Sequence, residues 1–323
     1  MSRSIILACA FIFALLGAAR AIAEAPPEFL LAWGTYGTAD GRLGQPRALA
    51  MAPDGTIYVA EWENHRIQQF TPDSASVRTW GSPGTAPGQF NHPAGIAIAA
   101  NGDVYVVDSY NHRVQKFDAL GTPLLQWGSL GAGPGQFRYP AGIAIAPGGD
   151  VYVADRENHR MQVFDASGNF VLSWGALGSG DAEFVFPSAV GVDADGGVYV
   201  AANNREMKKF DPTGRFILKW GSFGARPGQF SEVRGIAIDA SGIYCVDGEN
   251  SRIEKFDRSG AFLTEWGGCC NGAGRFYYPF GIAADGTGRV YVADTFNHRI
   301  QKFGDASTQT RRTTWGRIKA LYR

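Results

Sequence analysis

Short apolar runs separated by polar turns recur along the whole chain. In one copy, over residues 151–165, the runs 151–154 and 161–164 are β-prone, and the polar residues between them can form a hairpin turn. An apolar segment opened by proline precedes this hairpin at 140–145, and a further apolar run, 170–174, ends at Trp-Gly. The pattern therefore predicts four antiparallel strands in each repeat.

Six copies of this unit are visible, and their second strands begin at residues 57, 104, 151, 198, 243 and 290. Trp-Gly falls at 33, 80, 127, 174, 220, 266 and 315, so the period is close to 47 residues. The first two runs of each copy are apolar almost throughout, which predicts that neighbouring sheets cover both of their faces. A period of this length with four strands is typical of a propeller blade. We therefore predict an all-β fold, a six-bladed β-propeller of four-stranded antiparallel blades.

The two ends of the chain are predicted to close the ring. Residues 29–34, FLLAWG, resemble the fourth strand of a blade whose first three strands are missing. The sixth copy has the opposite defect, because three good strands are followed by the polar run 303–315. We therefore predict that residues 29–33 pair with residues 299–303, so that the N-terminal strand completes blade six.

The first 23 residues combine a short basic start, an apolar run and a small-residue site, which is the pattern of a secretory signal peptide. We expect cleavage after Ala23, a secreted or periplasmic (cell-envelope) protein, and no membrane span, because no later run is long enough. Residues 24–305 would form the propeller. The tail, 306–323, holds five basic residues and no acid, and we interpret it as a solvated extension. Without residues 1–23 the chain has 28 basic and 30 acidic groups, and this balance does not favour a nucleic-acid partner.

Asn-His-Arg triplets occur at 64–66, 111–113, 158–160 and 297–299. They resemble the NHL repeat family, and the resemblance extends over residues 29–303. It implies a six-bladed propeller but no single function, because NHL propellers serve as protein-binding and RNA-binding modules, sensor domains and lyases. Copy four departs most from the pattern, being one residue shorter with Ala202 in place of the acid and Glu206 in place of arginine.

An acidic residue and the triplet arginine occur together in five copies, and the copy that lacks the acid also lacks the arginine. This correlation predicts a cross-strand ion pair at each hairpin rather than a catalytic group. The four triplet histidines occupy the same position of different blades, so the ring should spread them apart. We interpret them as structural turn residues and predict no metal site. The predicted ion pairs are Glu61–Arg66, Asp108–Arg113, Asp155–Arg160, Asp247–Arg252 and Asp294–Arg299.

The resemblance also raises the question of an enzyme, because the peptidyl-α-hydroxyglycine α-amidating lyase carries zinc-binding histidines directly after the proline of each inner strand. None of the equivalent positions here is histidine, so we predict no catalytic residue and no cofactor. A lyase or hydrolase with its site at the channel mouth is the alternative function, and an envelope structural protein is a third. The positions are Arg47, Ala94, Ala141, Ser188, Arg234 and Phe280.

Three cysteines follow residue 23, namely Cys245, Cys269 and Cys270. An odd number leaves at least one thiol unpaired or intermolecular. We favour a bridge between Cys245 and one of the adjacent pair, since a Cys269–Cys270 disulfide would need a strained peptide.

The copies differ most in the turns between their second and third strands and in the loops that lead into their inner strands. Both sets of loops should lie on one face, where aromatic and arginine side chains typically form binding surfaces. We therefore predict a monomeric binding or scaffold module for a protein, peptide or glycan. Two arginines at the channel mouth favour an anionic group such as a carboxylate. The predicted ligand-binding residues are Arg47, Trp62, Tyr110, Tyr139, Arg156, Arg234, Tyr278, Phe280 and Phe296.

Overall fold

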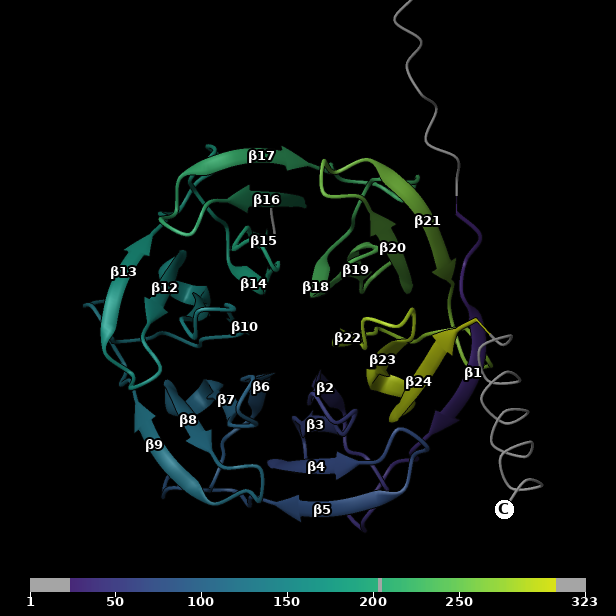
Figure 1. Cartoon of the computed structure of the whole chain (residues 1–323), viewed down its shortest axis with the longest axis horizontal. Helices are drawn as coiled ribbons and strands as arrows, with labels where there is room; N and C mark the ends of the chain where they lie inside the picture. Colours follow the sequence, from purple (N-terminus) through teal and green to yellow (C-terminus); the bar gives the residue numbers. More distant parts are fainter. Residues whose placement is uncertain (1–23, 203–204, 306–323) are drawn as a thin grey trace, which may run out of the picture.

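The computed structural model describes residues 24–202 and 205–305, which form a ring of six four-stranded antiparallel sheets (Figure 1). This arrangement confirms the predicted all-β, six-bladed propeller. The predicted signal peptide and basic tail, residues 1–23 and 306–323, lie outside the described residues.

Each blade runs from an inner strand at the channel to an outer strand at the rim. Three hairpin turns contain a single 3₁₀ turn, namely η1 (Ser109–Asn111), η2 (Arg156–Asn158) and η3 (Thr295–Asn297). The strands, from inner to outer, are β2 (Pro46–Met51), β3 (Ile57–Glu61), β4 (Arg66–Phe70) and β5 (Ser76–Trp80) in blade one; β6 (Pro93–Ile98), β7 (Val104–Asp108), β8 (Arg113–Phe117) and β9 (Pro123–Trp127) in blade two; β10 (Ile143–Ile145), β11 (Val151–Asp155), β12 (Arg160–Phe164) and β13 (Phe170–Trp174) in blade three; β14 (Pro187–Val192), β15 (Val198–Ala202), β16 (Glu206–Phe210) and β17 (Phe216–Trp220) in blade four; β18 (Val233–Asp239), β19 (Gly242–Asp247), β20 (Arg252–Phe256) and β21 (Phe262–Gly267) in blade five; and β22 (Ile282–Ala284), β23 (Val290–Asp294), β24 (Arg299–Gly304) and β1 (Glu28–Trp33) in blade six.

The N-terminal strand closes the ring. β1 pairs antiparallel with β24, with Phe29 opposite Phe303 and Trp33 opposite Ile300, and a bulge lies between Phe29 and Leu31. Figure 1 shows the purple β1 outside the yellow β24, where the two ends of the sequence meet. The predicted closure is confirmed.

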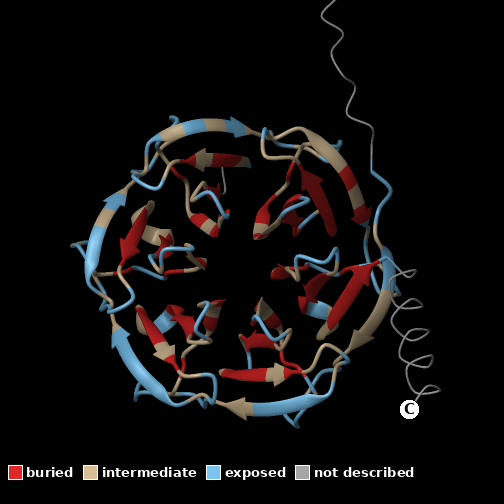
Figure 2. Cartoon of the chain, viewed as in Figure 1, coloured by how far each residue is buried: buried red, intermediate tan, exposed pale blue. Residues whose placement is uncertain are grey.

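The core consists of apolar clusters between neighbouring blades. In one of them Tyr58 and Ile67 of blade one pack against Ile96 and Phe117 of blade two. The second strand of every blade is buried along its whole length, whereas the outer strands carry most of the exposed positions (Figure 2). Both faces of the inner strands of each blade are therefore covered by neighbouring blades, as the apolar runs predicted.

The predicted ion pairs are formed in all five blades, with N–O distances of 2.6 to 3.1 Å. In blade two, Arg113 Nε donates to Asp108, and its terminal nitrogens donate to the carbonyl oxygens of Thr85, Ala86 and Gln89. These carbonyls belong to the loop that leads into the blade. The pair is buried and fully hydrogen-bonded, so its role is to hold this loop in place.

The triplet histidines fasten one blade to the next. Each adopts a left-handed backbone conformation, and its Nδ1 accepts a hydrogen bond from the backbone N–H of a residue that leads into the following blade. The donor–acceptor distances are 3.0 to 3.2 Å, and the pairs are His65 with His92, His112 with Tyr139, His159 with Phe186 and His298 with Gln45.

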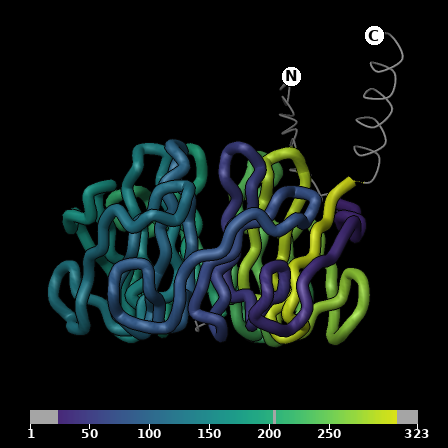
Figure 3. Tube along the Cα trace, turned by 90° about the horizontal axis from the view of Figure 1, so that it is seen from below, coloured from purple at the N-terminus to yellow at the C-terminus, as the bar shows by residue number. Residues whose placement is uncertain are grey.

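Seen edge-on, the ring has two faces on which the strand connections gather (Figure 3). We call the face that carries the turns between second and third strands, such as residues 62–65, the front face. The back face carries the turns between first and second strands, such as residues 52–56. Within the described residues the structure holds no helix long and apolar enough to cross a lipid bilayer.

Candidate binding site on the front face

A cavity of about 350 Å³ opens on the front face over blades one to three. It forms because the hairpin turns of these blades project beside small residues, Ala94 and Ala141, at the start of their inner strands. Five of the nine residues predicted to bind ligand line it, namely Arg47, Trp62, Tyr110, Tyr139 and Arg156.

Arg47 is the central cation of this cavity. Its guanidinium carbon lies 3.8 Å from the ring centre of Trp62 and 4.5 Å from that of Phe280, so it contacts one aromatic ring of its own blade and one of blade six. Burial, together with repulsion from Arg234 and Arg156, lowers its pKa to about 9, and the group stays cationic at neutral pH. None of the described residues accepts a hydrogen bond from its side chain or forms an ion pair with it.

The other two predicted arginines have carboxylate partners. Arg234 forms an ion pair with Glu232 and lies 4.7 Å from the Phe280 ring, beside the narrow central channel. Burial lowers the pKa of Arg234 and raises that of Glu232. Arg156 pairs with Glu157 at 3.0 Å. Arg47 is therefore the one predicted arginine that forms no ion pair with a carboxylate among the described residues.

Aromatic rings form the wall of the cavity. The Trp62 and Tyr110 ring centres are 5.4 Å apart, those of Tyr110 and Tyr139 are 5.1 Å apart, and His92 lies 4.7 Å from Trp62 and 4.6 Å from Tyr110. The predicted set did not include His92. The signal was present, because His92 precedes the proline of its blade in the same position as Tyr139.

The remaining predicted residues lie elsewhere. Phe280 stands between Arg47 and Arg234 and links the cavity to the channel. Tyr278 and Phe296 form a separate cluster with Tyr277 on blade six, with ring centres 5.5 to 5.7 Å apart, and all three rings are exposed. The predicted residues therefore lie in three places: five line the front-face cavity, Arg234 and Phe280 lie beside the channel, and Tyr278 and Phe296 lie at the rim of blade six.

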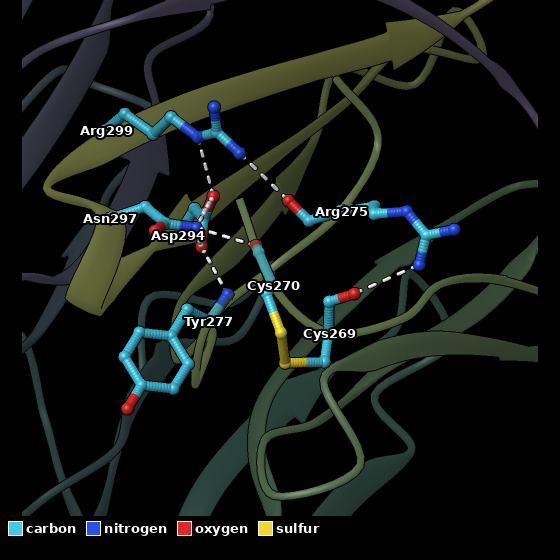
Figure 4. Close-up of a disulfide and its surroundings, with 7 residues drawn as sticks. All are labelled: Cys269, Cys270, Arg275, Tyr277, Asp294, Asn297 and Arg299. Carbon is cyan, nitrogen blue, oxygen red and sulfur yellow. Dashed lines mark hydrogen bonds and ion pairs between the residues drawn. A yellow bond between two sulfur atoms is a disulfide. The ribbon is translucent and has the colours of Figure 1, made fainter. Parts of the chain in front are cut away.

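The cysteines require a correction. Cys269 and Cys270 are joined to each other, with their Cα atoms 3.3 Å apart (Figure 4). Cys245 is a free, buried thiol. The predicted bridge from Cys245 is wrong because β19 directs this residue into the core between blades four and five, beside Met207 and Phe256. The adjacent pair lies in the exposed loop after β21. Burial raises the pKa of the Cys245 thiol.

Hydrogen bonds hold the disulfide loop against blade six. The carbonyl oxygen of Cys270 accepts from Asn297 Nδ2, and that of Cys269 accepts from Arg275, each at 3.0 Å (Figure 4). No cluster of three or more histidine, cysteine or acidic side chains suited to a metal ion occurs in residues 24–202 and 205–305.

Six four-stranded blades around a channel define the chain as a β-propeller. NHL repeat models match residues 43–70, 90–117, 137–164 and 276–303, which belong to blades one, two, three and six. The chain is therefore an NHL-repeat propeller. The unmatched blades are four and five, in which the Asn-His-Arg triplet is altered.

Solved structures with the same fold share little sequence with this chain. A structural genomics protein of unknown function from Bacteroides thetaiotaomicron VPI-5482 is 19% identical, with a TM-score of 0.63 over 84% of this chain and 74% of that one. Kuenenia stuttgartiensis hydrazine synthase is 14% identical (TM-score 0.58; 84% and 98% covered), and virginiamycin B lyase from Staphylococcus aureus is also 14% identical (TM-score 0.57; 81% and 95% covered). No curated protein sequence matches the chain. Identities this low indicate a shared fold and do not transfer a function.

Proposed function

We propose that this protein is a binding or scaffold module that holds a protein, peptide or glycan ligand in the front-face cavity through an anionic group. The observation that carries this proposal is Arg47, a cation without an acceptor that is stacked between Trp62 and Phe280 at the edge of the cavity. Stacking occupies the faces of the guanidinium and leaves its N–H edge for a ligand.

A carboxylate is the anionic group that this geometry favours. A planar guanidinium donates two parallel hydrogen bonds to a carboxylate, and stacking fixes the Arg47 side chain before the ligand arrives, which reduces the entropy lost on binding. The rings of Trp62, Tyr110 and Tyr139 would then contact the body of a peptide or sugar, because aromatic side chains supply large contact areas with few rotatable bonds.

Peptide and glycan libraries probed with the purified chain would test this proposal. We expect ligands with a carboxylate to bind, and the variants Trp62→Ala and Arg47→Met to weaken their binding by about 1 to 3 kcal/mol while the melting temperature changes little. Arg215→Met is the matched control, because this arginine is exposed on the back face. Ligands that bind all three variants equally would place the site elsewhere.

We further propose that the chain acts as an exported monomer in the periplasm or outside the cell, after loss of residues 1–23. The apolar run and small-residue site of those residues support export. Intact mass of the exported protein tests the cleavage, and light scattering tests the oligomeric state. A chain that retains Met1 in the cytoplasm would contradict the proposal.

A further inference from the structure

The back face carries a larger cavity, of about 830 Å³, between blades six, one and two. Its lining has two chemically different ends. One end holds Arg289, Tyr291 and Lys302 of blade six, and the other is apolar, with Met51 and Ile98 near the channel. Neither end belongs to the front-face site.

The equivalent positions in blade two show one way in which the repeat compensates a lysine here. Asp103 directly precedes the second strand and forms an ion pair with Lys116, at 2.9 Å, while the hydroxyl of Tyr105 donates to the carbonyl of Ala166 in the next blade at 3.5 Å. A carboxylate therefore neutralises the lysine, and the tyrosine hydroxyl has an acceptor.

Blade six reverses the charge at the first of these positions. Arg289 stands where Asp103 stands in blade two, so Lys302 faces a second cation instead of a carboxylate. Lys302 is only 3% exposed, and its ammonium group has three donors but makes one hydrogen bond, to the carbonyl of Pro72 at 2.9 Å. Burial and repulsion from Arg289 lower its pKa. Neither cation forms an ion pair with any described residue.

The tyrosine of blade six is also unusual. Its counterparts in the other five blades all form a hydrogen bond through the hydroxyl, and among the described residues that of Tyr291 forms none. The carbonyl oxygen that this hydroxyl would reach by analogy, that of Pro72, accepts a hydrogen bond from Lys302 but none from Tyr291, whereas in blade two the Ala166 carbonyl accepts from both Tyr105 and Lys116. The Tyr291 side chain is 1% exposed and lines the cavity, and no described residue accepts a hydrogen bond from its hydroxyl.

Three acids also line this cavity, and although the charges of Asp73 and Asp285 partly offset the lowering of the Lys302 pKa, none of the three forms an ion pair with a described cation. Asp54 accepts a hydrogen bond from the backbone N–H of Thr56, and Asp285 accepts from Thr287 and from the backbone N–H of Arg289, so each is held by its own turn. Asp73 is exposed to solvent. None of the three forms an ion pair with Arg289 or Lys302.

We propose that the back-face cavity binds a small amphipathic anion, whose acid group accepts hydrogen bonds from Lys302, Arg289 and Tyr291 and whose apolar chain lies against Met51 and Ile98. The Tyr291 hydroxyl has no described acceptor, the Lys302 ammonium has donors left over, and Arg289 forms no ion pair with a described residue, so an anion that accepts from all three gains charge-assisted hydrogen bonds. The cavity is of a size typical for small ligands. Ala284 continues the apolar end and leaves room for several methylene groups.

Calorimetric titration of the purified full-length chain with octanoate tests this proposal, with octyl phosphate, inorganic phosphate and octan-1-ol as companion probes. We expect one octanoate per chain and about 10- to 100-fold weaker binding of octan-1-ol, which lacks the charge, and of inorganic phosphate, which lacks the chain. Tighter binding of octyl phosphate than of octanoate would support the site and identify a phosphate head group.

Two variants separate binding from folding. Arg289→Asp recreates the ion pair of Asp103 and Lys116, so it should abolish octanoate binding while the melting temperature stays equal or rises. Lys302→Met should weaken binding about 10- to 100-fold. The controls are Lys116→Met, which changes the same position of blade two, and Trp62→Ala on the front face, and both should bind octanoate as the parent chain does.

Three results would overturn the proposal. One is unchanged octanoate binding in Arg289→Asp and Lys302→Met. Another is octan-1-ol binding as tight as that of octanoate, which would indicate an apolar site without anion recognition. The third is an equal loss of binding in Lys116→Met or Trp62→Ala, which would place the ligand elsewhere.

Discussion

Replacing Glu254 by glutamine should stabilise the protein. Glutamine occupies the equivalent position in four of the other blades, as Gln68, Gln115, Gln162 and Gln301. In blade two the Gln115 amide donates to the carbonyl of Gln89 and to Asp108. Glu254 is completely buried beside Asp247, also completely buried, and both carboxylates depend on Arg252 for compensation.

The magnitude follows from the pKa of Glu254, which burial raises from 4.5 to about 8, with the charge of Asp247 adding to the increase. Below pH 4.5 the carboxyl is protonated in both the folded and the unfolded chain. Between pH 4.5 and 8 the unfolded chain loses the proton and the folded chain keeps it, so stability falls as pH rises, and it levels off above pH 8. At 1.36 kcal/mol per pKa unit the cost is under about 1 kcal/mol at pH 5 and about 3 kcal/mol at pH 7.

Urea unfolding of the parent chain and of Glu254→Gln, measured from pH 5 to pH 9, checks this reasoning. The gain in unfolding free energy should grow by about 2 kcal/mol between pH 5 and pH 7 and level off above pH 8. Gln115→Glu is the matched control, because it creates the same pair of buried carboxylates in blade two and should destabilise with the same pH profile. A gain that does not vary with pH, or a loss of stability, would refute the buried-charge argument.

Three further predictions concern the closure, the histidines and the cysteines. Deleting residues 24–34 should lower the melting temperature sharply, because it leaves blade six without its outer strand, whereas deleting 307–323 should matter far less; the opposite ranking in thermal unfolding would contradict the closure by β1. Burial lowers the pKa of His65 and His112, whose Nδ1 atoms accept hydrogen bonds, so the free energy of unfolding should fall as pH drops below about 6.5. The variant His112→Ser, which introduces the residue of blade five, should reduce the dependence of this free energy on pH between about pH 7 and pH 5. An unchanged pH dependence would argue against this role of the histidine. Mass spectrometry after alkylation should find no modified thiol in the folded chain without residues 1–23, one (Cys245) after denaturation and three after reduction; a second thiol modified without reduction would exclude the Cys269–Cys270 disulfide.

The repeat made most of the scaffold predictable from sequence. Once six copies are aligned, strand order, closure and the acid–arginine pairs follow from position alone, because equivalent residues have equivalent surroundings. The pairing of the cysteines could not be predicted in this way, because the cysteines do not recur in the repeat. The pairing of Cys245 depends on which way β19 turns it, and the sequence of that strand is apolar on both faces, so alternation could not indicate that its side chain enters the core between blades four and five.

The predicted ligand-binding residues lie in three separate places, which the sequence also could not indicate. Sequence position predicted one face for all of them, in loops and at the starts of inner strands, but the ring spreads blades around an axis, and residues at similar positions of distant blades do not meet. Tyr278 and Phe296 of blade six therefore form a cluster of their own, while Tyr110 and Tyr139 belong to adjacent blades and line one cavity. His92 contacts Trp62 and Tyr110 of that cavity, and the predicted set lacked it although its position before the proline matches that of Tyr139.

Departures from the repeat are informative in this protein because the repeat defines what each position ordinarily does. Glu254 replaces the glutamine of the repeat at a completely buried position. It lines neither of the two cavities described above, so no ligand in them can compensate its cost in stability. Arg289 occupies a position that varies among the blades, and it places a second cation opposite Lys302 in a cavity that can admit an anion. Arg47 shows the same combination on the front face, with a cation that lacks a carboxylate partner beside a cavity. Between residues 24 and 305 the chain holds 23 basic and 30 acidic residues, so carboxylates are abundant, and the lack of an ion pair at these two cations beside cavities is the reason we propose a ligand that supplies the negative charge.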